Sequence, residues 1–564
     1  MSCGPQVPDI PELNCYNRPV NSIELFKNEI QRRVFVRADA DHRITSAVSG
    51  TPIETPWIFD FRALMLDAPW LDIYAEIFWE KYAYAYPFQV GGLETASIAL
   101  ISAIVMKSVQ RGTPVNGFFI RKSRKREGLM KQVEGTLNEH PVILVDDLIN
   151  SGGSFQKQIV VLEALQARVS NIFAIVAFRA SDAYAFATKK NISVDTLFTL
   201  RDFGLPLQTS ITPDSPQESF DIVWTYRGPQ PSLEHVVQKS APILDAHRIY
   251  FGTDAGTFIA LDQASGTEVW RFQIGRFATG KGIFSTPVVH EGTVYFGAYD
   301  GNMYALDAAT GTVRWKNTDA DWIGSSPDIA PKLGLVYIGL EFGLFKKRGG
   351  IAAIDIRTGK TMWRDTTPSL THGSPLYIAP ENMVVIGSND GIVYAYDAQK
   401  GTKQWQYQTS GDIKTTPAYD AATRGIIINS MDGRVYALSI RGALLWAFEA
   451  GGPLYSIPLI HDKFVYAASL DKHVYALDIE TGKKTYEFAT LGRIFASPIV
   501  ADGSLWIGSN DGRLYELAPD TLKQKSFHQF SERIVSKIAH NPATQTIFVK
   551  TIANEVYCLK KKNS

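Results

Sequence analysis

The 564-residue sequence has little cysteine, no net charge and no long apolar run. Its cysteines, Cys3, Cys15 and Cys558, are odd in number and far apart, which excludes a disulfide framework and a cysteine zinc site. Basic and acidic residues both number 57, so no net positive field favours nucleic acid as a partner. No run of about 18 apolar residues occurs, and no basic segment followed by an apolar one opens the chain. We therefore expect a cytoplasmic protein without a membrane partner.

The sequence divides into two halves with different patterns. Hydrophobic residues make up 45% of the chain, enough to exclude a disordered protein. Strands alternate with helices in the first half, whereas glycines, aromatics and period-2 patterns dominate after about residue 219. The segment 206–219 is rich in Pro, Ser and Thr and is the predicted linker. This predicts one domain over residues 1–205 and another over 220–564.

An α/β fold is predicted for the first half. Helix patterns at 95–109 and 154–167 alternate with strand patterns at 117–120, 141–145 and 172–178. Such alternation is typical of a mostly parallel sheet with helices on its faces.

The second half repeats itself with a period of about 40–48 residues, which predicts four short strands per repeat and a β-propeller. Seven rows are complete between about residues 239 and 530, and an eighth begins at Val535 but has three strands at most. The missing strand is predicted at 220–227, where Trp224 stands in the position of the closing aromatics. The chain ends would then close an eight-bladed ring, which removes exposed sheet edges. The other closing aromatics are Trp270, Trp315, Trp363, Trp405, Trp446 and Tyr486.

These rows, such as VYFGAYDGNMYALDAATGTVRW from Val294, resemble the quinoprotein-type (PQQ-like) propeller repeat. Quinone-binding members of that family use calcium and a vicinal disulfide, and this chain has no adjacent cysteines. We therefore expect no PQQ and predict that the ring binds a partner protein as a scaffold. A propeller-centred quinone or sugar enzyme remains a further alternative.

One segment of the first half, VILVDDLINSGGSFQ, suits a sugar-linked phosphate. An apolar strand is predicted to end in Asp146 and Asp147, whose carboxylates can accept hydrogen bonds from vicinal hydroxyls. A loop over residues 148–153 then leads into a helix whose N-terminal amides and dipole attract an anion. The alternative is an ordinary strand–helix turn. The residues predicted to cradle the phosphate are Asn150, Ser151, Gly152, Gly153 and Ser154.

This segment resembles the signature of the phosphoribosyltransferases, and the surrounding residues 35–180 resemble the orotate phosphoribosyltransferases in particular. The resemblance implies a pyrophosphate loop that includes Gly92, Leu93, Glu94 and Thr95. It implies a mobile catalytic loop in RKSRKREG, where Arg121, Lys122 and Lys125 would neutralise departing pyrophosphate; a solvated surface loop is the alternative. It also places Arg179 against the carboxylate of the base.

By the same resemblance, the reaction displaces pyrophosphate from phosphoribosyl pyrophosphate (PRPP) by a base nitrogen. Magnesium would be held mainly by substrate oxygens and water, with no direct protein ligand. The family's basic loop also implies a homodimer through the first domain. Three positions depart from the family's pattern: Ala96 replaces a lysine, Glu127 replaces a histidine, and the family's orotate-contacting lysine is replaced near Val48.

Two functions follow for the first domain. The first is an active, PRPP-dependent transferase. The second is a catalytically degenerate domain that senses PRPP or a nucleotide and regulates a partner through the propeller. Ala96 favours the second, and the retained basic loop favours the first.

Overall fold

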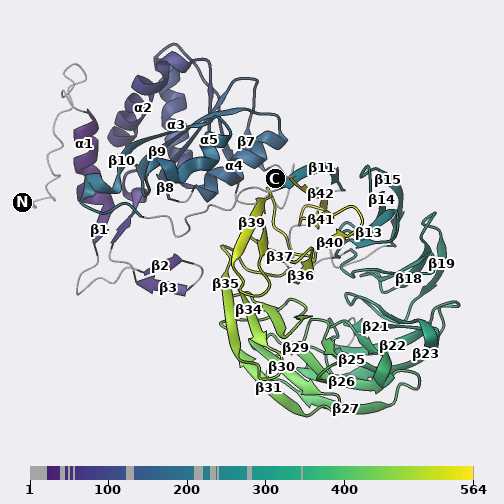
Figure 1. Ribbon diagram of the computed structural model, residues 1–564. Helices are drawn as coiled ribbons and strands as arrows, with labels where there is room; N and C mark the ends of the chain where they lie inside the picture. Colours follow the sequence, from purple (N-terminus) through teal and green to yellow (C-terminus); the bar gives the residue numbers. More distant parts are fainter. Residues whose placement is uncertain are drawn as a thin grey trace, which may run out of the picture. The chain divides into compact units, whose positions relative to one another are not determined.

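Figure 1 shows the computed structural model of the chain. The chain divides into two compact units, residues 1–48 with 52–213, and residues 49–51 with 214–564. Among the described residues, no helix is both long and apolar enough to span a membrane. The described residues are 22–37, 45–48, 51–54, 57–121, 132–150, 152–208, 220–228, 237, 240–275, 282–343 and 347–562.

A six-stranded sheet forms the centre of the first unit. From β10 to β6 all neighbouring strands run parallel, and only the edge strand β7 is antiparallel. The predicted α/β fold with a mostly parallel sheet is therefore confirmed. The strands lie in the order β10 (Ser193–Thr199), β9 (Val169–Ala177), β8 (Val142–Ile149), β5 (Gln89–Leu93), β6 (Gly117–Ile120) and β7 (Val133–Gly135).

Helices cover both faces of this sheet. Alternate side chains of a strand point to opposite faces, so a strand with apolar residues in succession needs cover on both. On β8, Ile143 and Val145 join the core formed with α2 and α3, and Val142 and Leu144 join the core formed with α4. The helices are α1 (Ser22–Glu29), α2 (Ala68–Tyr82), α3 (Ala96–Gln110), α4 (Gly153–Ala164) and α5 (Ala185–Lys189). Single helical turns lie at Ile30–Val34, Phe61–Ala63, Ala83–Ala85, Ser181–Tyr184 and Leu200–Phe203. Short strand pairs join β1 (Phe35–Arg37) to β4 (Trp57–Phe59), and β2 (Thr45–Val48) to β3 (Thr51–Glu54).

The second unit is a β-propeller of eight four-stranded sheets. Its last blade is completed as the sequence predicts, because β11 (Phe220–Arg227) pairs antiparallel with the C-terminal strand β42 (Glu555–Lys561). The other two strands of that blade are β40 (Ala539–Asn541) and β41 (Thr546–Lys550).

The remaining seven blades each consist of four consecutive strands. In chain order their strands are β12–β15 (Ile243–Leu244, Arg248–Gly252, Thr257–Asp262, Glu268–Gln273), β16–β19 (Val288–His290, Thr293–Gly297, Met303–Asp307, Val313–Asn317), β20–β23 (Asp328–Ala330, Leu335–Phe342, Arg348–Asp355, Thr361–Thr367), β24–β27 (Leu376–Ile378, Met383–Gly387, Ile392–Asp397, Lys403–Gln408), β28–β31 (Ala418–Asp420, Gly425–Asn429, Arg434–Ser439, Leu444–Glu449), β32–β35 (Leu459–His461, Phe464–Ala468, His473–Asp478, Lys484–Ala489) and β36–β39 (Ile499–Ala501, Ser504–Gly508, Arg513–Leu517, Gln524–Gln529).

A tryptophan and a glycine join most neighbouring blades. Trp224 donates its indole N–H to the carbonyl of Gln263 in the next blade at 3.0 Å, and its ring covers Gly266. Gly266 has φ +70°, and a Cβ there would lie 2.4 Å from the ring, so both conformation and space require glycine. The same pairing recurs between Trp270 and Gly311, Trp315 and Gly359, Trp363 and Gly401, Trp405 and Gly442, and Trp446 and Gly482.

Candidate active site

The strand order brings the predicted site segments of the first unit to one edge of the sheet. These segments lie at the carboxyl ends of β5, β6, β8 and β9, which are neighbours and run parallel. From β5 the chain crosses through α3 to β6, and from β8 it crosses through α4 to β9 in the opposite direction along the sheet. Ligands of open α/β sheets bind outside the strand ends at such a reversal.

Asp146 and Asp147 lie within β8 rather than at its end, because the strand continues to Ile149. The expected loop over residues 148–153 is therefore shorter, since α4 already begins at Gly153. Asp146 is buried and its carboxylate accepts the backbone N–H of Asp147 at 3.1 Å. Burial raises the pKa of the Asp147 carboxyl above its usual range. The two acids thus lie near the carboxyl end of β8 and are partly removed from solvent.

The turn between β8 and α4 depends on Gly152. This residue has φ +75°, and a Cβ would lie 2.3 Å from the ring of Phe186. Gly152 is the N-cap residue of α4, and no side chain caps the helix there. The first amides of α4, including those of Gly153 and Ser154, therefore have no intrahelical acceptor and can bind an anion. Ser151 lies outside the described residues.

The turn after β5 packs closely against β8. A Cβ on Gly92 would lie 2.4 Å from the Ser97 side chain and 2.6 Å from the Val145 carbonyl oxygen, so only glycine fits. Leu93 ends β5, the peptide bond between Glu94 and Thr95 is cis, and Ala96 opens α3.

Arg121 follows β6 and faces this turn. Its guanidinium lies 3.8 Å from the Glu94 carboxylate and 3.5 Å from that of Glu134. The residue predicted to begin the mobile loop therefore adjoins the predicted pyrophosphate loop. Lys122, Lys125 and Glu127 fall outside the described residues, so their predicted roles stay predictions.

Arg179 follows β9 and contacts the turn between β8 and α4, since its Nε donates to Oδ1 of Asn150 at 3.0 Å. Sequence reasoning missed two neighbours of this region. Trp57 packs edge-on against Phe178 with ring centroids 5.6 Å apart, and the charge of Asp60 adds to the raised pKa of Asp147. The aromatic-rich stretch PWIFDF was the available signal for both.

The resemblances of the two units raise two cofactors, a metal ion and a quinone. Among the described residues, no group of three or more His, Cys, Asp or Glu side chains is placed to hold a metal ion. Cys558 is buried in β42 and Cys3 and Cys15 are distant in sequence, so the chain cannot form the vicinal disulfide on which quinone-binding relatives stack the ring. These residues do not fit the quinone.

Comparison with known proteins gives separate matches for the two units. Orotate phosphoribosyltransferase of Rhodopirellula baltica is 36% identical over 126 residues, covering 22% of this chain and 65% of the relative, just under two thirds. Orotate phosphoribosyltransferase of Bradyrhizobium sp. strain ORS 278 is 30% identical over 182 residues, covering 31% of this chain and 92% of the relative.

The propeller matches a family model described as "Outer membrane protein assembly factor BamB" over residues 217–341, 332–446 and 389–521. A quinohemoprotein alcohol dehydrogenase from Comamonas testosteroni shares the fold with a TM-score of 0.51 and 15% identity, covering 61% of this chain and 77% of that one. The chain therefore belongs to the orotate phosphoribosyltransferase family through its first unit and to the BamB-type, PQQ-like propeller family through its second.

Proposed function

We propose that the first unit binds PRPP at the strand-end site and transfers its phosphoribosyl group to a nitrogenous base, releasing pyrophosphate. One observation carries the proposal: Asp146 and Asp147 lie near the carboxyl end of β8, the strand whose turn leads into the uncapped N-terminus of α4. A ribose 5-phosphate needs this combination: carboxylates that accept hydrogen bonds from the ribose hydroxyls, and a neighbouring site for the phosphate.

The 5-phosphate would lie on the turn 150–154. Gly152 gives the backbone a left-handed conformation with no side chain in the way, and the amides of Gly153 and Ser154 begin the helix. Asn150 and Ser151 would add side-chain donors. The helix dipole increases the attraction for a dianion.

The two acids would accept hydrogen bonds from the ribose hydroxyls. The transition state of this reaction resembles an oxocarbenium ion, so nearby carboxylate charge stabilises it more than the ground state. The raised pKa of Asp147 shows that its charge is poorly solvated. A positive charge developing on the sugar would therefore interact strongly with it.

Pyrophosphate would leave between the turn Gly92–Leu93–Glu94–Thr95 and the basic loop. Arg121 is only loosely paired, because both of its carboxylate neighbours lie beyond normal hydrogen-bond distance. Its guanidinium can therefore turn to the leaving group, together with Lys122 and Lys125. Magnesium bound to pyrophosphate oxygens and water would supply further charge, and Arg179 would bind a base carboxylate or carbonyl.

A second candidate is a domain that binds PRPP or a nucleotide without turnover and signals through the propeller. It is favoured by Ala96, which supplies no charge at the first residue of α3, where the family has a lysine. In both cases the propeller would act as a scaffold for a partner protein, and the first unit would form a homodimer.

The test is an assay of pyrophosphate release by the full chain with PRPP, magnesium and a panel of purine and pyrimidine bases. The key variant is Asp146→Asn/Asp147→Asn. The matched control is Glu139→Gln, which changes an exposed acid before β8, at the opposite edge of the same sheet. Release lost only in the double variant supports the transferase, and PRPP binding without release supports the sensor. Absence of both binding and release contradicts both.

A further inference from the structure

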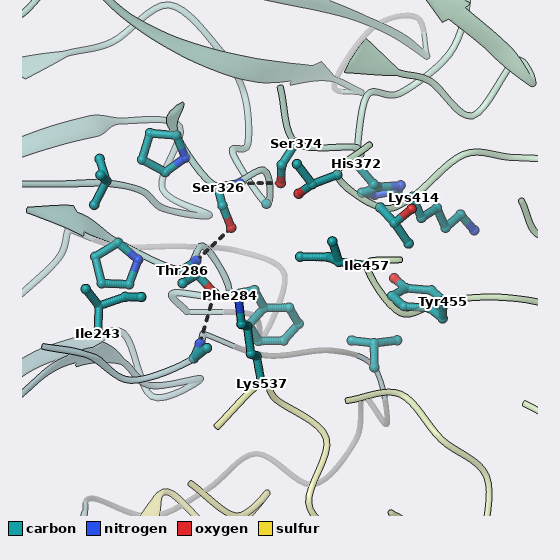
Figure 2. Close-up of a pocket in the computed structure, with 18 of the residues that line it drawn as sticks. Ile243, Phe284, Thr286, Ser326, His372, Ser374, Lys414, Tyr455, Ile457 and Lys537 are labelled. Atoms are coloured by element: carbon teal, nitrogen blue, oxygen red, sulfur yellow. Dashed lines mark hydrogen bonds between the residues drawn. The ribbon is translucent and has the colours of Figure 1, made fainter. Parts of the chain in front are cut away.

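The propeller encloses a cavity of about 420 Å³ that its own blades line. Lining residues come from seven of the eight blades, so the cavity lies in the central channel rather than between two blades. Its volume falls in the range of small-molecule sites. Figure 2 shows Lys537 reaching into the middle of the lining residues.

A single repeated position supplies much of the lining. This is the residue two before the first strand of each blade, usually followed by proline. Seven of its eight occupants line the cavity: Ala241, Thr286, Ser326, Ser374, Thr416, Ile457 and Lys537. Lys537 is the only charged residue in the set, so its presence is a departure from the repeat.

Three hydroxyls at this position accept hydrogen bonds from the backbone of the preceding blade. The backbone N–H of Ala241 donates to Thr286, that of Thr286 to Ser326, and that of Ser326 to Ser374, at 3.0, 2.9 and 2.8 Å (Figure 2). Each hydroxyl oxygen is thus an acceptor from the backbone. Within the described part of the chain, none of the three donates its own hydrogen to a protein group. The O–H groups remain available to a ligand that accepts hydrogen bonds.

The other two basic side chains that line the cavity each have an acidic neighbour. Lys414 lies 3.0 Å from the Asp412 carboxylate, and His372 lies 3.1 Å from that of Glu341. Among the described residues, no carboxylate lies within ion-pair distance of Lys537. Its side chain is exposed to the cavity, yet the surrounding protein lowers the pKa of its ammonium by desolvation. The ammonium of Lys537 therefore faces the cavity without an acidic partner among the described residues.

We propose that the propeller channel binds a small organic oxyanion, a carboxylate or a phosphate, with Lys537 as its charge partner. The hydroxyls of Thr286, Ser326 and Ser374 donate to the oxyanion, and the rings of Phe284 and Tyr455 line the space for an attached flat body. Burial raises the pKa of Tyr455 to about 12, so its hydroxyl also stays protonated and able to donate. This site is separate from the strand-end site and does not depend on the proposed transferase activity.

The test is calorimetric titration of the full chain with four probes: inorganic phosphate, uridine monophosphate, orotate and citrate. The variants are Lys537→Met and, as a matched control, Lys332→Met, which removes an exposed lysine of the propeller. We expect Lys537→Met to weaken one probe by about 10-fold or more, the usual loss for a charged hydrogen bond. If only the phosphate-bearing probes lose affinity, the headgroup is a phosphate. If only the carboxylate-bearing probes do, it is a carboxylate. Binding at the strand-end site would survive both variants, which separates the two sites.

A second measurement locates the site without relying on that variant. Amine labelling of the full chain, read by mass spectrometry, should show Lys537 protected by the binding probe and Lys332 unprotected. Thr416→Trp, which fills the cavity while keeping the cation, should abolish the protection. Equal affinities in Lys537→Met and Lys332→Met for all four probes, or no protection of Lys537 by any of them, would overturn the proposal.

Discussion

The two units place their polar groups by different means. In the propeller, one position recurs in every blade, so a departure such as Lys537 is visible against seven equivalents. In the first unit, each site residue occurs once, and its neighbours come from strands far apart in sequence. Repetition therefore reveals which residues are exceptional, whereas a single-copy site can be recognised only from its chemistry and from the strand order.

The largest effect should come from breaking the ring closure. Deleting residues 220–227 removes β11 and exposes the edge of β42. We expect the propeller Tm to fall by about 10 °C or more, since a strand and the Trp224 contact with the first blade are lost together. Tyr226→Phe, which removes only the hydrogen bond to Glu268, is the control and should change Tm little. An unchanged melting curve in the deletion variant would show that β11 does not close the ring.

A repeat position tests the tryptophan–glycine pairing. Gly442 has φ +80° and lies under Trp405, so Gly442→Leu should cost about 3 kcal/mol or more. In the one blade junction where Tyr486 replaces tryptophan, Leu522 takes the glycine position at φ +54° and is buried. Leu522→Gly should therefore also destabilise, by about 2 kcal/mol, because it leaves a cavity. Both are read from denaturant unfolding, and a stabilising Gly442→Leu would contradict the pairing.

Substitution of Gly152 should destabilise the first unit for two reasons, which a control variant can separate. Gly152→Ala meets both a left-handed φ and the Phe186 ring, whereas Gly204→Ala meets the left-handed φ alone, with nothing within 4 Å. We expect losses of about 2–3 kcal/mol and about 1 kcal/mol, respectively. PRPP binding should fall only in Gly152→Ala. Equal losses in both variants would show that the Phe186 contact is unimportant.

The smallest effect concerns the pH dependence of stability. Because burial raises the pKa of Asp147, its folded state holds the proton more tightly than its unfolded state. The resulting destabilisation is absent below the unfolded pKa and appears as pH rises through the folded pKa. Asp147→Asn should therefore raise the Tm of the first unit at neutral pH by about 1–3 °C and have no effect near pH 3. A variant that is less stable at neutral pH would contradict this.

Much of the propeller could be predicted from the sequence because its rows repeat. The eight blades and the pairing of residues 220–227 with the C-terminal strand follow from counting strands, and Trp224 marks the outer strand. Aligning Ser536-Lys537-Ile538 with the Ser-x-Pro of other rows would also have placed Lys537 in the channel.

The first unit was predictable in its elements and less so in its arrangement. Strand 117–120 is confirmed to the residue, but the continuation of β8 through Asp147 to Ile149 was missed, because acidic residues resemble a strand end. That β5 and β8 are neighbours, and that Arg179 contacts Asn150, depend on sheet order and loop geometry. A single sequence does not encode these in any local pattern.

Equilibrium binding of PRPP tests the central claim most directly. Calorimetric titration of the full chain with PRPP and magnesium should give a saturable signal that Glu139→Gln retains and Asp146→Asn/Asp147→Asn loses. Equal binding in the two variants, or no binding to the unmodified chain, would contradict the strand-end site.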